Sequence, residues 1–599
     1  MMGKREMISD GTVDIRPRLY HNSWDERYRR PFGAVKKNTQ LELFVEAEGM
    51  SEVWLEIHRD FGEHESLKMD PAADGFSIAF PITGTVLYYY HFRGLTANNE
   101  TILYGNNEQG YGGEGRMVSD PRHISDYQIT VYDDDDYAPL WYREGVAYHI
   151  FIDRFHIGDE NKRIFRENAF IYGAKTDLPM YIKDDKGDIL RWDFFGGDLW
   201  GVIQRLPYLK KLGITILYLS PIFAARSNHR YDTGDYLRIE PMIGGEEAFV
   251  ELIREADKLG MKLILDGVFN HCGADSIYFD RYNRHGGGAY HNVTSPCRQW
   301  FHLTEDNQYD SWWGVADLPR FNLKNEELRD FLLKVVSKWS AYGIGGWRLD
   351  VADELEDDFI AQIRGCLSKD QVLLGEVWED PTNKISYGKR RYYVKGGHLH
   401  GVMNYPFRKC ILDYVKCNRS GEETARRLNS YLENYPPHVL YNNLNNLGSH
   451  DTMRLITELN GDVALVKLSL LFLLMLPGVP CIYYGDEVGL PGGRDPDNRR
   501  FFPWDQADNA LHQFYVEMIR YRKEHSAMIH GDLRVVARGK LLVIIRQYET
   551  QWVYACFNPG TGEYRITDDE YGINKVIPPK GFAIEDGTHY DGKHHLLLQ

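Results

Sequence analysis

An alternation of short apolar runs with amphipathic segments most constrains the fold of this 599-residue chain. Runs typical of buried strands recur from about Tyr137 onward: VAYHIFI, ITILYLS, KLILDGV, GWRLDV, QVLLGEV and VPCIYYG. Helix-like segments separate them. In GGEEAFVELIREADKLG, Phe249, Leu252, Ile253 and Ala256 share one helix face, and Gly260 ends the helix. About eight such repeats predict a (β/α)8 barrel of the TIM type, with a doubly wound parallel sheet as the alternative.

Three regions differ from this pattern. Residues 1–136 alternate strand-like runs with turn residues, as in QLELFVEAEG, which predicts an N-terminal β-sandwich. The barrel is then expected over 137–529. Between its third and fourth strands, about 272–322, lies a segment rich in Gly, His and aromatic residues, which predicts an inserted lobe over the carboxyl-terminal face. The strand pattern returns over 530–599 and predicts a small C-terminal β-sandwich.

Composition excludes some partners. The formal charge of -17 and the lack of Lys and Arg clusters argue against nucleic acid. The apolar stretch LSLLFLLMLPGVP is too short to span a bilayer and ends in proline, and the first residues, MMGKREMISDG, show no apolar signal core. Seven scattered cysteines without a CxxC pair favour free thiols. We therefore expect a cytoplasmic protein without a membrane segment.

Charged residues stand at the ends of the predicted strands. In GWRLDVADE, Arg348 and Asp350 share one face of the strand, because successive side chains alternate. Alone, this pair reads equally well as a buried structural ion pair. Further strand ends carry more charged or polar residues: Asp266, Asn270 and His271; Glu376; and His450, Asp451 and Arg454. Strand ends converge at one mouth of a barrel, so these side chains are expected to meet there.

Three carboxylates beside an arginine suit the cleavage of a glycosidic bond. Arg348 is expected to keep Asp350 ionised as a nucleophile, while neighbouring negative charge keeps Glu376 protonated as the acid. Glu376 then becomes the base that activates water, and Asp451 binds sugar hydroxyls.

The motifs DGVFNH, GWRLDVADE, GEVW and NLGSHD, in this order, resemble those of the α-amylase family of glycoside hydrolases, family 13. GITILYLSPIF, SNHRYDTGDY, LPRFN and GVPCIYYGDEVGL also match. The resemblance covers about Gly145 to Trp504, and the preceding sandwich, which resembles a starch-binding domain, favours the neopullulanase, cyclomaltodextrinase and maltogenic amylase group.

The resemblance implies Asp350 as nucleophile, Glu376 as acid/base and Asp451 as transition-state stabiliser, with retention of the anomeric configuration. It implies α-glucan oligosaccharides as substrates and a homodimer. It also implies a set of residues that bind or support the sugar: Arg348, His271, His450, His229, Tyr231, Asp266, Asn270 and Glu354.

Two features depart from the family pattern, Asp353 after the nucleophile and the stretch IGDENK, in which Ile157 and Lys162 stand at calcium-ligand positions. Asp353 replaces an Asn of the group's Val-Ala-Asn-Glu motif, which adds charge beside the acceptor subsites and puts α-1,6 cleavage and transfer in doubt. No cofactor is required by the resemblance, but relatives often bind calcium after the first strand. The oxygen donors that remain for it are Asp159, Asn161, Gly196 and Asp198, a thin set for an ion that takes about six to eight. The alternative is that Asp198 caps the following helix.

Rival functions remain at this stage. A glucanotransferase, phosphorylase or α-glucosidase of the same fold would use the same carboxylates. A non-catalytic glucan-binding protein would be expected to have lost them, and this chain has not. The sequence leaves the preferred substrate open among cyclodextrins, pullulan, starch and short maltodextrins.

Overall fold

The computed structural model describes residues 17–588 apart from 163, 165, 186 and 188. The described residues divide into two compact units, one with residues up to Asp134 plus Asn429–Pro436, the other with Asp135–Leu428 and the described residues from Pro437 onward. The N-terminal stretch that lacks a signal pattern lies outside the described residues. The predicted domain limits at 136 and 529 stay predictions.

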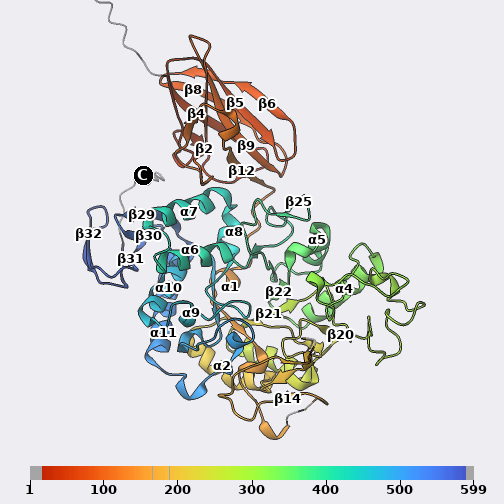
Figure 1. Ribbon diagram of the computed structural model, residues 1–599. Helices are drawn as coiled ribbons and strands as arrows, with labels where there is room; N and C mark the ends of the chain where they lie inside the picture. The colour runs from red at the N-terminus through yellow and green to blue at the C-terminus, as the bar shows by residue number, and fades with distance from the viewer. Residues whose placement is uncertain (1–16, 163, 165, 186, 188, 589–599) are drawn as a thin grey trace, which may run out of the picture. The chain divides into compact units, whose positions relative to one another are not determined.

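The first unit is built from two sheets (Figure 1). One contains β1 (Arg18–Tyr20), β2 (Arg29–Arg30), β4 (Gln40–Glu48), β7 (Asp70–Ala72) and β8 (Gly75–Pro81). The other contains β3 (Val35–Lys36), β5 (Met50–Arg59), β6 (His64–Lys68), β9 (Leu87–Thr96), β10 (Thr101–Gly105), β11 (Arg116–Val118) and β12 (Tyr127–Tyr132). Alternate residues of β4 and β9, among them Leu41, Val45 and Phe92, are buried in one shared core.

The second unit contains a barrel of eight parallel strands, so the predicted fold is confirmed. In chain order they are β13 (Ala147–Ile150), β18 (Ile216–Leu219), β21 (Lys262–Gly267), β22 (Gly346–Leu349), β23 (Val372–Gly375), β26 (Gly401–Val402), β27 (Leu444–Asn446) and β28 (Val479–Tyr483). Met403 pairs with Leu444 directly after β26, which joins the two ends of the sheet. Nearly every strand residue is buried, as both faces of a barrel wall require.

Helices cover the outside of the strands: α2 (Leu199–Leu212), α3 (Gly245–Lys258), α4 (Glu326–Ser340), α5 (Asp357–Gly365), α6 (Tyr405–Val415), α10 (Val463–Met475) and α11 (Ala510–Glu524). In α3 the predicted face is buried at Phe249, Leu252 and Ala256, and Gly260 follows the helix with a φ of 68°. The apolar segment considered for a membrane span forms α10 and β28. Within the described residues, no helix combines the length and hydropathy needed to cross a bilayer.

Two long excursions leave the barrel. Residues 272–322 follow β21 and contain only short 3-10 turns, η5 (Arg298–Trp300) and η6 (Trp312–Gly314), among their described helices. A second excursion, between β13 and α2, carries η2 (Ile152–Arg154), η3 (Glu160–Lys162), β14 (Phe170–Ile171), β15 (Ile182–Lys183), β16 (Ile189–Arg191) and β17 (Asp193–Phe194). The sequence patterns did not indicate this second excursion as a separate feature.

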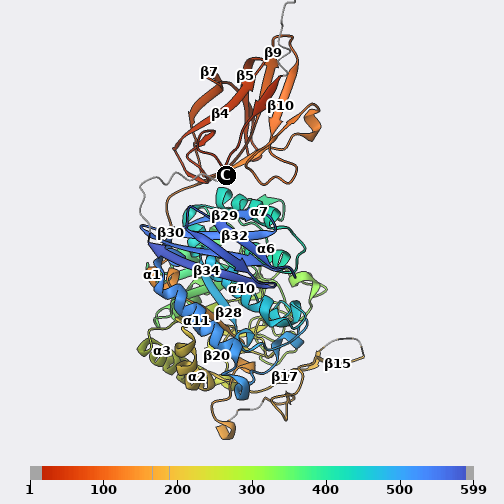
Figure 2. The ribbon, with the colours of Figure 1, turned by 90° about the vertical axis from the view of Figure 1, so that its left-hand side faces the viewer.

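The last strands form a sheet of β29 (Asp532–Arg538), β30 (Leu541–Tyr548), β31 (Gln551–Asn558) and β34 (Gly581–Thr588), with β32 (Tyr564–Asp568) and β33 (Ile573–Ile577) paired beside it. Figure 2 shows this sheet against α10 on the outside of the barrel, and the two are in contact. Because α10 is covered on both sides, it is apolar all round.

Glu487, a buried carboxyl group shortly after β28, makes the free energy of unfolding depend on pH. Glu487 accepts hydrogen bonds from the hydroxyls of Tyr148 and Tyr208 at 2.7 and 2.9 Å. Burial raises its pKa to about 7, from an ordinary value of 4.5. A raised carboxyl pKa means that the folded state holds its proton more tightly, so stability is lost as pH rises from about 4.5 to 7.

We expect Glu487→Gln to remove this loss. Relative to the unmodified protein, the variant should gain about 3 kcal/mol of unfolding free energy between pH 4.5 and 7.5. Urea unfolding at a series of pH values measures the change. Glu524→Gln, at a 63% exposed side chain on α11, is the matched control and should show no such gain. A constant difference between Glu487→Gln and the parent across this range would contradict the assignment.

Candidate active site

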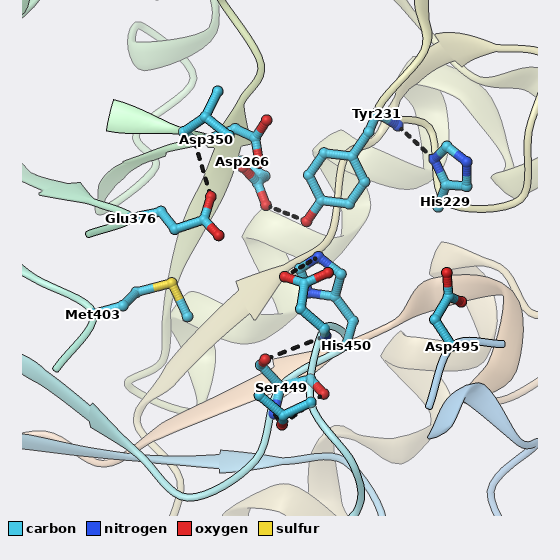
Figure 3. A network of polar contacts seen from close by, with 12 residues as sticks. His229, Tyr231, Asp266, Asp350, Glu376, Met403, Ser449, His450 and Asp495 are labelled. Atoms are coloured by element: carbon cyan, nitrogen blue, oxygen red, sulfur yellow. Dashed lines mark hydrogen bonds and ion pairs between the residues drawn. The ribbon is translucent and has the colours of Figure 1, made fainter. Parts of the chain in front are cut away.

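Arg348, at the end of β22, holds carboxylates from three neighbouring strands. Its Nη1 lies 2.8 Å from Asp266 Oδ1 and 2.8 Å from Asp350 Oδ1, and its Nη2 lies 2.9 Å from Glu376 Oε2. The register places Asp266 beside Arg348 across β21 and β22, and Glu376 follows the end of β23. Figure 3 shows the side chains of Asp266, Asp350 and Glu376 gathered together. The strand ends therefore converge as the sequence predicted.

Glu376 is fixed at both carboxylate oxygens. Oε2 also accepts the backbone N–H of Val351 at 2.9 Å, and Oε1 accepts the indole N–H of Trp378 at 3.0 Å. Val351 has a φ of 40°, which a β-branched residue adopts only under strain, at a cost of about 1–3 kcal/mol. This turn directs the amide of Val351 at Glu376. The strained backbone of Val351 therefore helps to orient the carboxylate of Glu376.

The third predicted carboxylate, Asp451, contacts basic residues other than Arg348. Asp451 Oδ2 is 3.1 Å from His450 Nε2, and Asp451 Oδ1 is 3.7 Å from Arg499. Its side chain is 32% exposed, while those of Asp350 and Glu376 are 9% and 8% exposed. Asp451 is therefore the carboxylate most open to a ligand.

Crowded negative charge and burial govern protonation in the cluster. Three carboxylates share the single guanidinium of Arg348, so full ionisation would leave an excess negative charge. Burial is the largest influence on Asp350 and raises its pKa well above the ordinary range, although Arg348 lowers it. Burial and the charge of Glu376 raise the pKa of Asp451 to about 7. The cluster thus retains a proton more readily than the sequence suggested, since Arg348 alone does not offset burial.

Burial favours the neutral form of the histidines of the site. Burial lowers the pKa of His271 to about 3 and that of His229 and His450 well below the ordinary range. Neutral imidazoles donate or accept hydrogen bonds without adding charge. His271 Nε2 and Asn270 Oδ1 are buried and have no hydrogen-bond partner among the described residues. No described protein atom satisfies the hydrogen-bonding capacity of these two atoms.

Tyr231 forms one wall of the site. Its hydroxyl donates to Asp266 Oδ2 at 2.8 Å, and its ring stacks on His450 with centroids 5.0 Å apart. His229 accepts the backbone N–H of Tyr231 through Nδ1 at 3.1 Å. Asp266 is fully buried and supports Arg348 and Tyr231 from behind. Arg454, by contrast, lies outside the cluster and pairs with Asp486 at 3.3 Å.

The sequence analysis did not identify Trp378 and Arg499 as candidate functional residues. The ring of Trp378 stacks on Tyr405 with centroids 3.8 Å apart, and Arg499, paired with Asp495 at 2.9 Å, faces Asp451. Trp378 belongs to the motif GEVW, so its closeness to Glu376 along the chain could have identified it as a candidate site residue. Arg499 comes from the segment after β28, which has no strand or helix period.

Glu354 lies on η7 (Ala352–Glu354), among exposed aromatic groups. It accepts hydrogen bonds from Trp313 and from Tyr387, and Arg320 lies 3.3 Å away. Trp313 stacks on Trp312, with centroids 5.1 Å apart. Glu354 therefore contacts Trp313, Tyr387 and Arg320 rather than Arg348.

Asp353 was expected to add an unbalanced negative charge beside the acceptor subsites, but its carboxylate has a cationic neighbour. Its carboxylate accepts the hydroxyl of Tyr393 at 2.7 Å and lies 3.3 Å from the ammonium of Lys384. Burial raises the pKa of Asp353, while Tyr393 and Lys384 lower it. The neighbouring cation balances the carboxylate locally, so its effect on the acceptor side is smaller than expected.

Two of the four candidate calcium donors, Asp198 and Asp159, accept hydrogen bonds from backbone N–H groups. Asp198 Oδ1 accepts the backbone N–H groups of Gly158 and Gly201 at 3.1 and 2.6 Å, and so caps α2. Asp159 Oδ1 accepts the N–H of Asn161, while the N–H of Gly196 is donated to Asp153. Within the described part of the chain, no three His, Cys, Asp or Glu side chains are arranged around a metal position. The geometry fits the helix-cap alternative.

We expect Asp198→Ala to lower the free energy of unfolding by about 1–2 kcal/mol, because α2 loses its N-terminal cap. Chemical denaturation measures the loss, with Asp198→Asn as the matched control that retains most of the cap. Incubation with EDTA should leave the midpoint of thermal unfolding unchanged. A midpoint that falls with EDTA and recovers with calcium would contradict the cap as the role of Asp198.

A parallel barrel with clustered carboxylates at the carboxyl ends of its strands defines a class of protein, the barrel-type glycoside hydrolases. Residues 149–513 match the family model described as "Alpha amylase, catalytic domain". The chain belongs to the α-amylase family.

Relatives refine this assignment. Neopullulanase 2 of Thermoactinomyces vulgaris is 34% identical over 70% of this chain and 70% of its own length. An amylopullulanase of Thermoanaerobacter thermohydrosulfuricus is 33% identical over 95% of this chain and 44% of its own length. The chain spans less than half the length of the amylopullulanases it matches. A cyclic alpha-maltosyl-(1-->6)-maltose hydrolase from Arthrobacter globiformis has a similar solved structure, with a TM-score of 0.68 and 30% identity over 76% of this chain and all of that one.

Proposed function

We propose that the protein is a retaining α-glucan hydrolase that cleaves α-1,4-glucosidic bonds of maltooligosaccharides, cyclodextrins or pullulan. The observation that carries this proposal is the contact of Asp350 and Glu376 with adjacent nitrogens of Arg348. Two carboxyl groups held by one guanidinium are close neighbours. Double displacement requires a separation of about 5–5.5 Å, whereas inversion requires about 6.5–9.5 Å to admit a water molecule.

In the proposed reaction Asp350 attacks the anomeric carbon, and Glu376 donates a proton to the glycosidic oxygen as the leaving group departs. Glu376 then takes a proton from water, which attacks the glycosyl-enzyme and releases the sugar with its configuration retained. The hydrogen bonds from Val351 and Trp378 hold Glu376 in place during both steps. Asp350 must give up a proton before it attacks, and the contact with Arg348 favours its ionised form.

The remaining residues are proposed to bind the sugar. Asp451 and Arg499 take hydroxyl groups on the open side, and the unpaired atoms of Asn270 and His271 accept or donate to others. The ring of Tyr231 offers an apolar face to a pyranose, with His450 stacked behind it. His229 and Glu354 are proposed to contact sugar units beyond the cleavage point, and Arg348 and Asp266 to support the nucleophile.

Product analysis on β-cyclodextrin, pullulan and starch, run side by side, tests the substrate class. The proposal expects cyclodextrin to be degraded faster than starch. Equal or faster digestion of starch would contradict the preference for small or cyclic substrates. Products that lengthen when acceptor sugar is added would favour a glucanotransferase instead.

We also propose a cytoplasmic homodimer. The scattered cysteines favour a reducing compartment, because none of the described ones forms a disulfide. Sedimentation at working concentration should give twice the 69.6 kDa chain mass, and a monomeric mass would contradict the dimer.

A further inference from the structure

An arginine-lined cavity lies beside the candidate site, in the excursion between β13 and α2. Its volume is about 720 Å³. Four arginines and one acidic residue are among the groups that line it: Arg166, Arg191, Arg226, Arg284 and Glu167. The chain as a whole carries a net charge of -17, so this local excess of cations runs against its composition.

Two of these arginines are already paired. Arg166 lies 2.7 Å from the buried carboxylate of Glu240, and Arg284 lies 3.6 Å from Asp275. Arg191 and Arg226 form no ion pair with any residue that the structure describes, and the Arg226 guanidinium contacts the ring of Tyr282 at 5.8 Å. Like charges at one cavity repel, and a bound anion would offset that repulsion.

A smaller cavity shares lining residues with this cavity and with the candidate site. Its volume is about 120 Å³, and Trp192, Arg226 and His229 line it, so it shares two residues with the larger cavity. The rings of Trp192 and His229 meet edge to face, with centroids 4.8 Å apart. In Figure 3 His229 lies beyond Tyr231 from Glu376. The cavity therefore adjoins the side of the site away from the proposed acid, where the non-reducing part of a glucan would lie.

The two cavities differ in charge. Asp232, Asp275 and Asp317 line the smaller cavity, whereas Glu167 is the one acidic residue among the described residues that line the larger cavity. The larger cavity is therefore the more favourable of the two for an anion. Guanidinium groups present several N–H donors in a plane, which matches the oxygens of a phosphate group.

We propose that the arginine-lined cavity binds a phosphate ester on the non-reducing end of an α-glucan chain. This inference rests on the proposed function, because the glucan must occupy the site for its end to reach the cavity. Arg191 and Arg226, which form no ion pair with the described residues, supply the donors, and Trp192 borders the sugar that carries the phosphate. Inorganic phosphate shares the same chemistry and is distinguished by experiment.

The test compares kcat/KM for maltotetraose with that for maltotetraose phosphorylated at the 6-hydroxyl of its non-reducing end. The unmodified protein should prefer the phosphorylated substrate by at least about tenfold, the effect of one charge-assisted hydrogen bond. In the double variant Arg191→Ala/Arg226→Ala the preference should fall to about twofold or less. Arg254→Ala, at a 61% exposed side chain on α3, is the control and should keep the preference.

Calorimetric titration with inorganic phosphate at low ionic strength is the second arm. Binding of inorganic phosphate with no preference for the phosphorylated glucan would overturn the assignment to a phosphate ester. Equal losses on both substrates in the double variant would also overturn it, because the arginines would then bind neutral hydroxyls. If the unmodified protein cleaved neither substrate, the proposed function would fail. Loss of phosphate binding in the double variant would still support an anion site in that case.

Discussion

Replacement of Asp350 by alanine is expected to lower kcat for α-glucan cleavage by at least about 10⁴-fold while the fold is retained. The proposed nucleophile is lost, and no other carboxylate contacts Arg348 from the same position. Stability should not suffer, because Asp266 and Glu376 still pair with the buried guanidinium and the repulsion among three carboxylates is relieved.

Turnover of maltotetraose, with circular dichroism and thermal unfolding as checks on the fold, measures this effect. Asp358→Ala is a matched control, since Asp358 lies at the start of α5 with a 68% exposed side chain. The control should retain full turnover. An Asp350→Ala protein that folds and keeps more than a tenth of the parent activity would contradict the nucleophile assignment.

The second large effect concerns Glu376→Gln. Cleavage of maltotetraose should fall by about 10³-fold or more, because no group in the same position protonates the leaving sugar. A maltosyl fluoride needs no such proton, since fluoride departs unaided. The first step with this substrate should therefore be much less impaired in Glu376→Gln, whereas Asp350→Ala should be impaired on both substrates.

The fluoride comparison is a burst experiment, in which rapid release of fluoride is followed by slow turnover. Asp358→Ala, at a 68% exposed side chain, serves again as the control and should keep full activity on both substrates. Equal losses of Glu376→Gln on the fluoride and on maltotetraose would contradict the acid role.

Much of the barrel could be predicted from apolar runs of four or more residues. Six strands were visible in this way, but β26 and β27 contain two and three residues, too few to show a strand period. Their place in the wall is fixed by pairing with neighbours, as between Met403 and Leu444. Such pairing depends on the closure of the whole sheet and leaves no local pattern.

The convergence of Arg348, Asp350 and Glu376 followed from the position of charges at strand ends. The protonation balance did not, because it depends on how deeply the cluster is buried. The strained backbone of Val351 and the salt bridge between Asp353 and Lys384 were also invisible. Each feature involves contacts between separate segments of the chain. The spacing of residues along the sequence does not predict such contacts.

Mass spectrometry of a trapped intermediate tests the central claim most directly. The Glu376→Gln variant, mixed with maltosyl fluoride and quenched in acid, should carry one maltosyl group on the peptide that contains Asp350, because water is no longer activated to remove it. Steady hydrolysis of the fluoride with no glycosylated peptide, or with the sugar attached at another residue, would contradict double displacement at Asp350.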